Sequence, residues 1–161
     1  MENIELRQYQ SSDYEAVLQL HFQGLQQYGV HISSELISGL DDDLGRIQEE
    51  YLKNGEFLIA TDNEKIVGMG ALRRIDSKTA EIKRMRVRQA HQGKGIGSLI
   101  LDNLIEKAEK RGYKRLILDT TEKMQVAQNL YKSKGFREYK RDTFRNVLIV
   151  YYELDLGEYS V

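Results

Sequence analysis

The chain has 161 residues, 40% of them hydrophobic and 30% charged, and we expect residues 1–161 to form a single domain with one core. It contains no cysteine, which excludes disulfides, thiolate metal sites and a cysteine nucleophile, and its three histidines are too scattered for a histidine-rich metal site. No stretch approaches the roughly 20 consecutive apolar residues of a membrane span. The first residues, Met1–Ile4, lack the basic and then apolar pattern of a signal peptide, so we expect a cytoplasmic protein. From the lack of cysteine and the scattered histidines, we also expect that it uses no metal.

The formal net charge of −1 hides an asymmetry between the two halves of the chain. Residues 1–81 carry 7 basic and 15 acidic side chains, a net charge of −8, whereas residues 82–161 carry 17 basic and 10 acidic side chains, a net charge of +7. Such a division suggests that the second half meets an anion and that the first half tolerates or attracts a cation. A solvated surface can also carry such a division by chance.

A strand and two helical regions are predicted first along the chain. Ile4 to Tyr9 alternates as a strand, and Ser12 with Glu15 has the spacing of a capping box that opens a helix. A second helical region covers residues 33–53, weakened by its two glycines, and we expect its acidic run at residues 41–43 on the surface.

The rest of the chain alternates strands with two helices. Short links between the next three strands imply antiparallel pairing, and apolar residues at helical spacing follow. The predicted strands cover residues 57–60, 65–75, 79–87, 116–118, 136–141 and 144–154, and the predicted helices run from about 96 to 112 and from 122 to 134. This order predicts an α/β (α+β) fold with a mixed, largely antiparallel sheet of about seven strands and helices on both faces.

A glycine cluster, Gly93-Lys94-Gly95-Ile96-Gly97, leads from a loop into the first of these two helices. Glycines let the backbone approach an anion closely, and a helix N-terminus offers unpaired N–H groups. Residues 82–101 carry five basic side chains and no acid: Lys83, Arg84, Arg86, Arg88 and Lys94. The pattern favours a polyphosphate ligand, the alternative being a glycine-rich turn that exposes cations to solvent.

Three more specific interpretations of the glycine cluster and the basic residues around it have less support from the sequence. The Walker A spacing is absent, which argues against a nucleotide triphosphatase. Gly93, Gly95 and Ser98 imitate a dinucleotide fingerprint, with Asp119 at a strand end some way on, but too few βα units follow for a doubly wound sheet. A nucleic-acid binder using the basic run at 83–94 is disfavoured by the near-zero net charge and by the lack of interleaved aromatic residues, so we expect no nucleic-acid partner.

Two segments resemble signatures of the GCN5-related N-acetyltransferase (GNAT) family, whose members transfer an acetyl group from coenzyme A to amines. Gln92-Gly93-Lys94-Gly95-Ile96-Gly97 resembles the family's motif A, (R/Q)-x-x-G-x-(G/A). Ala127-Gln128-Asn129-Leu130-Tyr131-Lys132-Ser133-Lys134-Gly135-Phe136 is similar to its motif B, A-x-x-L-Y-x-x-x-G-F. Ala80-Glu81-Ile82 also fits the family's fourth strand, and the predicted element order follows the family fold along the whole chain.

The resemblance implies acetyl-CoA as the acyl donor. In this family the motif A amides hold the pyrophosphate of coenzyme A, and the preceding strand pairs with the pantetheine arm. The Met85 amide would then polarise the acetyl carbonyl, and Asn129 would contact pantetheine unless it is simply an exposed helix residue. Carried over to this chain, the cofactor-binding residues are Met85, Arg86, Val87, Gln92, Gly93, Lys94, Gly95, Ile96, Gly97, Ser98 and Asn129.

The resemblance also implies two catalytic side chains, Tyr131 and Glu81. Tyr131, in motif B, would give a proton to the departing thiolate, the alternative being a tyrosine that only packs its helix. Glu81 matches the catalytic glutamate of the histone-acetylating branch and would take the proton of the amine. Lys83, two residues on along the same strand face, makes a structural ion pair with Glu81 the rival interpretation. Many members have asparagine seven residues before the motif B tyrosine, where this chain has Met124.

The implied function is an N-acetyltransferase in which a small-molecule or peptide amine attacks acetyl-CoA directly in a ternary complex. Without cysteine, a cysteinyl acetyl-enzyme is impossible. The alternative is a non-catalytic acyl-CoA-binding module of the same fold, and a homodimer is compatible with either. We expect the amine groove between the first two helices and the last hairpin, where acidic and aromatic side chains gather: Asp41, Asp42, Asp43, Glu49, Glu50, Tyr28, His31, Tyr139 and Phe144.

Overall fold

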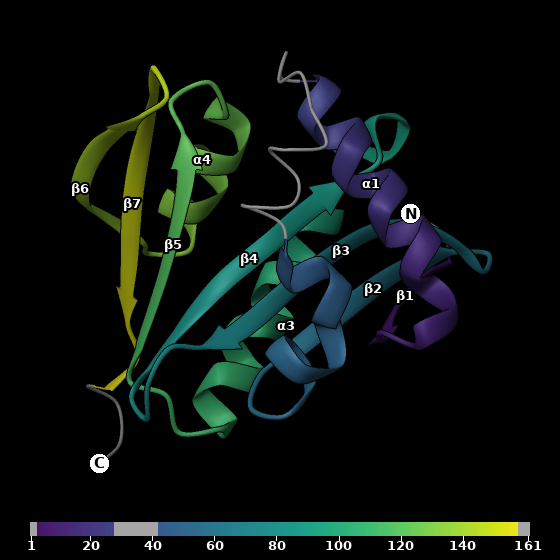
Figure 1. Ribbon diagram of the computed structural model, residues 1–161, viewed down its shortest axis with the longest axis horizontal. Coiled ribbons are helices and arrows are strands. Elements are labelled where there is room, and N and C mark those ends of the chain that lie inside the picture. The colour runs from purple at the N-terminus through teal and green to yellow at the C-terminus, as the bar shows by residue number, and fades with distance from the viewer. Residues whose placement is uncertain (1–2, 28–41, 158–161) are drawn as a thin grey trace.

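One mixed sheet forms the centre of the protein, and Figure 1 shows helices on both of its faces. The structure, a computed structural model, describes residues 3–27 and 42–157. The seven strands follow the order β1-β2-β3-β4-β5-β7-β6, and every neighbouring pair is antiparallel except β4 and β5. The strands are β1 (Ile4–Gln8), β2 (Glu56–Asp62), β3 (Lys65–Arg74), β4 (Thr79–Val87), β5 (Arg115–Thr121), β6 (Arg137–Phe144) and β7 (Val147–Asp155). The predicted fold class is confirmed.

The two faces of the sheet are covered by different helices, each with its own core. On one face lie α1 (Tyr14–Gln27) and the short helices η2 (Asp42–Arg46) and η3 (Gln48–Leu52), which enclose a cluster that includes Tyr51, Phe57 and Met69. On the other face lie α3 (Ile96–Lys110) and α4 (Gln125–Ser133), over a larger cluster. Figure 1 shows α1 in front of β3 and β4, with α3 behind them.

Helix α3 is held against the sheet by a stripe of buried side chains, Ile96, Ile100, Leu101, Leu104 and Ala108. Burial of each large apolar side chain contributes about 1.5–3 kcal/mol. The helix also approaches β3 closely, because a Cβ at Gly70 would lie 2.6 Å from a methyl carbon of Ile100. The position of the helix N-terminus is therefore fixed by the core beneath it.

The start of the first helix differs from the prediction. The structure places a 3-10 turn, η1 (Ser11–Asp13), before α1. Asp13, not Glu15, closes the turn, because its carboxylate accepts the Gln10 N–H at 2.8 Å and two hydrogen bonds from Arg7 of β1, at 2.7 and 2.8 Å. The Ser12 capping box was wrong because a cation from β1 holds the aspartate in place.

Two other elements also have boundaries that differ from the predicted ones. The predicted helical region at 33–53 is resolved only as η2 and η3, since its first nine residues lie outside the described ranges. The last predicted strand begins at Val147, because Arg145 and Asn146 take up left-handed backbone (φ 49° and 66°) as the two-residue turn of a hairpin.

A wedge opens between β4 and β5, the one parallel pair. The two strands pair only from Thr79 to Glu81 on β4 and from Arg115 to Ile117 on β5. Beyond this point they diverge, as Figure 1 shows, while each keeps its other neighbour. Strand β4 also contains a bulge, where Arg84 has a φ of 60° and the register with β3 shifts. Beyond the paired residues, the backbone N–H and C=O groups of β4 and β5 that face the wedge therefore have no partner on the opposite strand.

Candidate functional site

The predicted anion loop lies beyond the end of β4 and opens α3. Gly93 and Gly95 take up left-handed backbone, with φ of 77° and 87°, and Gly95 is the N-cap of the helix. No side chain of the described residues caps this end, and no acidic residue lies in the first turn. Outside the helix's own ladder, the described part of the chain gives the amides of residues 93–98 no backbone acceptor. The loop therefore presents a row of N–H donors at the positive end of a helix dipole.

Side chains on both sides hold this loop to the sheet. His91, in η4 (Gln89–His91), lies 3.2 Å from a carboxylate oxygen of Asp62 at the end of β2. The side-chain amide of Gln92 donates to the backbone carbonyl of Val87 at 3.0 Å. Of the predicted loop residues, Gln92, Gly93, Lys94 and Gly95 are exposed, Gly97 and Ser98 are half-buried, and Ile96 buries its side chain in the core. Ile96 can therefore contact a ligand only through its backbone.

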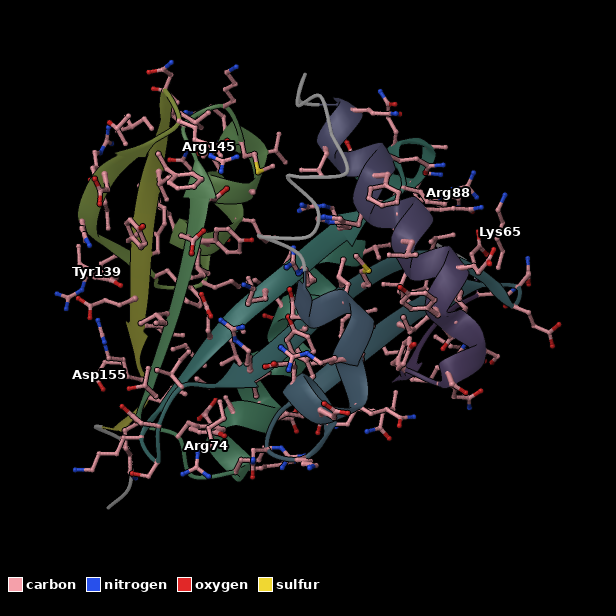
Figure 2. All side chains as sticks on the ribbon, viewed as in Figure 1. Lys65, Arg74, Arg88, Tyr139, Arg145 and Asp155 are labelled. Atoms are coloured by element: carbon pink, nitrogen blue, oxygen red, sulfur yellow. The ribbon has the colours of Figure 1, made fainter. Side chains whose placement is uncertain are left out.

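The backbone of β4 beyond the bulge leads from the wedge toward the loop. The Arg88 N–H donates to Val67 of β3 at 2.8 Å, so by strand alternation the backbone groups of Val87 and Met85 face the wedge. The side chain of Met85 packs on the α3 side, and the guanidinium of Arg86 donates to the Met85 carbonyl at 2.9 Å. Near this strand end, a hollow of about 310 Å³ is lined by Leu20, Gln23, Gly24, Gln26, Val87, Arg88 and Gln89. Figure 2 shows Arg88 there, beside α1.

A buried clamp holds the bulge, and the sequence did not predict it. Arg84 donates to both carboxylate oxygens of Asp43, and the Tyr51 hydroxyl also donates to that carboxylate. The exposed fractions of the Arg84 and Asp43 side chains are 9% and 7%. Burial alone would raise the pKa of Asp43, but the hydrogen bonds and charge of Arg84 outweigh it and lower the pKa. The prediction that the acidic run lies on the surface is therefore wrong for Asp43.

Tyr131, on α4, faces the core side of the sheet. It is only 6% exposed, and its ring lies edge-on to Phe136, with ring centres 5.9 Å apart, and 6.3 Å from Tyr152. Gln128, which the sequence did not single out, fixes this helix: its amide donates to the Thr121 carbonyl at 3.0 Å and accepts the Tyr152 hydroxyl at 2.9 Å. Tyr131 is thus held rigidly beside β5 and β7.

Glu81 lies on the opposite face of the sheet, where the wedge begins. Its carboxylate accepts a hydrogen bond from Arg73, directly across on β3, at 2.8 Å, and its side chain is 13% exposed. Glu81 therefore has an ion-pair partner, as the rival interpretation proposed, but the partner is Arg73 and not Lys83. An antiparallel partner faces Glu81 directly, whereas Lys83 is about 7 Å further along the same strand.

Asp119 of β5 lies on the same face as Glu81. It is two residues beyond Ile117, the partner of Glu81, and the alternate residues Leu118 and Thr120 are buried on the other face. Its side chain is exposed to solvent, yet partial burial and the nearby negative charge of Glu81 raise its pKa. The two carboxylates therefore share the mouth of the wedge.

The remaining predicted residues are scattered around the site. Asn129 is an exposed residue of α4, and its side chain makes no hydrogen bond to the described residues. Met124 is the N-cap of α4, and its sulfur accepts the Thr120 hydroxyl at 3.2 Å, which replaces the family's asparagine with a contact inside the fold. Tyr139, labelled in Figure 2, and Phe144 are exposed on β6. Tyr28, His31 and Asp41 lie outside the described residues, as does the side chain of Asp42, while Glu49 is exposed and Glu50 pairs with Arg46 at 2.9 Å.

Comparison with known proteins decides the family. Residues 14–136 match the model of the acetyltransferase (GNAT) family. The chain belongs to the GNAT family. The uncharacterized N-acetyltransferase YsnE of Bacillus subtilis is 35% identical to this GNAT protein over 111 residues, which are 66% of this chain and 74% of YsnE.

Solved structures support the same assignment. An acetyltransferase from Streptococcus agalactiae aligns with a TM-score of 0.84 at 26% identity, over 97% of this GNAT protein and 100% of that chain. The fold is also that of yncA from Salmonella typhimurium, solved with its cofactor acetyl-CoA, with a TM-score of 0.78 at 20% identity over 99% and 97% of the two chains. Across residues 3–27 and 42–157, no cluster of side chains could hold a metal ion, and no helix is long and apolar enough to cross a membrane.

Proposed function

We propose that this GNAT protein transfers an acetyl group from acetyl-CoA to an amine by direct attack in a ternary complex. The observation that carries the proposal is that β4, beyond its pairing with β5, leads to the loop at residues 93–98, whose amides have no backbone acceptor outside the helix's own ladder among the described residues. A pyrophosphate at those amides leaves the pantetheine arm to run along the backbone of β4 as an added strand. The thioester then lies where the wedge narrows.

The chemistry at the thioester needs a donor for the carbonyl oxygen and one for the sulfur. The Met85 amide, which alternation directs into the wedge, is the proposed donor to the developing oxyanion. Tyr131 is the proposed proton donor to the departing thiolate, because a phenol of pKa about 10 can supply a hydrogen bond, and then a proton, to a thiolate whose thiol has a pKa near 8.5. Because the chain has no cysteine, no cysteinyl acetyl-enzyme can form, which favours direct attack of the amine on acetyl-CoA.

Replacement of Tyr131 tests the enzyme against the alternative, a module that binds acyl-CoA without turnover. Tyr131→Phe keeps the ring and its packing against Phe136 and Tyr152 but removes the hydroxyl. We expect turnover to fall about 100-fold while the Kd for acetyl-CoA stays within about twofold. Thiol release over a panel of primary amines measures turnover, and calorimetry measures the Kd.

Tyr14→Phe provides the matched control, because that tyrosine is exposed at the start of α1, on the other face of the sheet from α4. It should leave both quantities unchanged. Unchanged turnover in Tyr131→Phe would contradict the role of the hydroxyl. Acetyl-CoA binding by the wild type without thiol release for any amine would favour the binding module.

A further inference from the structure

We propose, on the basis of the proposed acetyl transfer, that Asp119 binds the ammonium group of the acceptor and takes its proton, and that Glu81 influences the reaction only through Asp119. The carboxylate that the family resemblance selects is Glu81, on β4. The arrangement of charges at the mouth of the wedge favours the residue across from it, on β5.

The ion pairs on this face leave Asp119 as the available carboxylate. Glu81 is held by Arg73 at 2.8 Å, and Glu153 of β7 is held by Arg115 at 2.9 Å. Within residues 3–27 and 42–157, no hydrogen bond or ion pair engages Asp119. An exposed carboxylate without a partner can receive a cation without first breaking an existing pair.

The position of Asp119 along the strand matches the place where a thioester would lie. Pairing between β4 and β5 ends at Glu81 and Ile117, so Asp119 is the first residue on its face of β5 beyond the closed part of the wedge. Tyr131 lies on the other face, in the cluster beneath α3 and α4. A thioester in the wedge would therefore have its sulfur toward α4 and would be attacked from the face that carries Asp119.

The charged groups around Asp119 act on its pKa in opposite directions. Glu81 repels a second negative charge, whereas cations from β3 and β4 favour ionisation, and Tyr151 of β7 lies directly opposite in register. Burial and Glu81 prevail and raise the pKa of Asp119. The charged and titratable groups close enough to influence it electrostatically are Arg73, Glu81, Lys83, Arg84 and Tyr151.

The proton transfers balance as follows. Asp119 takes one proton from the ammonium group, and the neutral nitrogen attacks the thioester carbonyl, so that a C–N bond forms. Collapse of the intermediate breaks the C–S bond, the thiolate takes a proton from Tyr131, and the nitrogen loses its second proton to restore the phenol. Asp119 releases its proton to solvent, so one proton appears for each amide and each free thiol formed.

Two isosteric variants test the assignment. Asp119→Asn should lower kcat/KM for the amine by about 100-fold or more, remove the acidic limb of its pH profile, and leave the Kd for acetyl-CoA within about twofold. Glu81→Gln should keep most of the activity at neutral pH. Its acidic limb should move to lower pH, because removing the negative charge of Glu81 lowers the pKa of Asp119. Glu153→Gln, a paired carboxylate of the same face, is the control and should change neither quantity.

A loss of activity in Glu81→Gln with an active Asp119→Asn would overturn the proposal, as would full activity in both variants. Carbon NMR of labelled aspartate carboxyl groups provides a readout that does not depend on turnover. The Asp119 signal should titrate above the ordinary aspartate range in the wild type and at lower pH in Glu81→Gln. If the wild type shows no turnover, the proposed function fails. An Asp119 signal that titrates in the ordinary range, whatever residue 81 is, overturns the present inference by itself.

Discussion

Arg84 combines a left-handed backbone, which costs a non-glycine residue about 1–2 kcal/mol, with a buried ion pair to Asp43. The pair fixes the bulge of β4 in front of Met85, so a residue distant in sequence sets the orientation of the proposed oxyanion donor. Because both partners are buried, removing the charge of one leaves the other uncompensated in the interior.

We therefore expect Asp43→Asn to lower the free energy of unfolding by about 3–5 kcal/mol at pH 7. Urea denaturation measures the change. Glu106→Gln, which breaks an exposed pair with Lys110 on α3, should leave the free energy of unfolding almost unchanged. An Asp43→Asn protein as stable as Glu106→Gln would contradict the structural role of the clamp.

The ion pair between Asp43 and Arg84 also predicts how the free energy of unfolding depends on pH. The pKa of Asp43 is lower in the folded chain than in the unfolded one, so its contribution is complete above the unfolded pKa of about 3.9 and is lost as the pH falls toward the folded value. The wild type should lose stability below about pH 4 more steeply than Asp43→Asn. Equal slopes for the two proteins would show that this carboxylate does not titrate with folding.

At the level of elements, the glycine loop and α3 could be predicted because their signals are local. The glycine spacing, the apolar stripe and the strand before them lie in one continuous segment, and the structure keeps all three. Motif B could be identified from the sequence for the same reason, because its residues also lie in one continuous segment.

Features that depend on contacts between distant segments could not be predicted in this way. Arg73 displaced Lys83 as the partner of Glu81 because a neighbouring strand places it directly across. Asp43 is buried because Arg84, 41 residues further along the chain, reaches it. In the sequence, Asp119 is notable only as part of a disfavoured dinucleotide fingerprint, and only the end of the β4–β5 pairing reveals it beside Glu81.

The loop itself can be tested with two glycines that differ only in location. Gly93 and Gly112 both have positive φ (77° and 85°), and an added Cβ would meet no atom within 4 Å at either. Alanine at each should therefore cost a similar free energy of unfolding, about 1 kcal/mol. Only Gly93→Ala should weaken acetyl-CoA binding, by about tenfold, because only it reorients amides of the loop. Equal affinities for the two variants would place the cofactor elsewhere.

At the scale of the whole molecule, the sheet separates two tasks. The face under α3 and α4 holds Tyr131, the opposite face holds Glu81 and Asp119, and the wedge connects them. Donor and acceptor can thus approach the reacting carbon from different directions, as direct transfer requires. The charge difference between the two halves of the chain agrees with this arrangement, since the basic half contributes the proposed anion-binding loop.

The central claim is that the amides of residues 93–98 hold the pyrophosphate of coenzyme A. Calorimetry with acetyl-CoA and with S-acetylpantetheine, which lacks the pyrophosphate and the nucleotide, tests it most directly. We expect acetyl-CoA to bind at least about 100-fold more tightly, because two hydrogen bonds to a charged group are together worth about 3 kcal/mol. Equal affinity for the two compounds, or no heat with acetyl-CoA, would contradict the account.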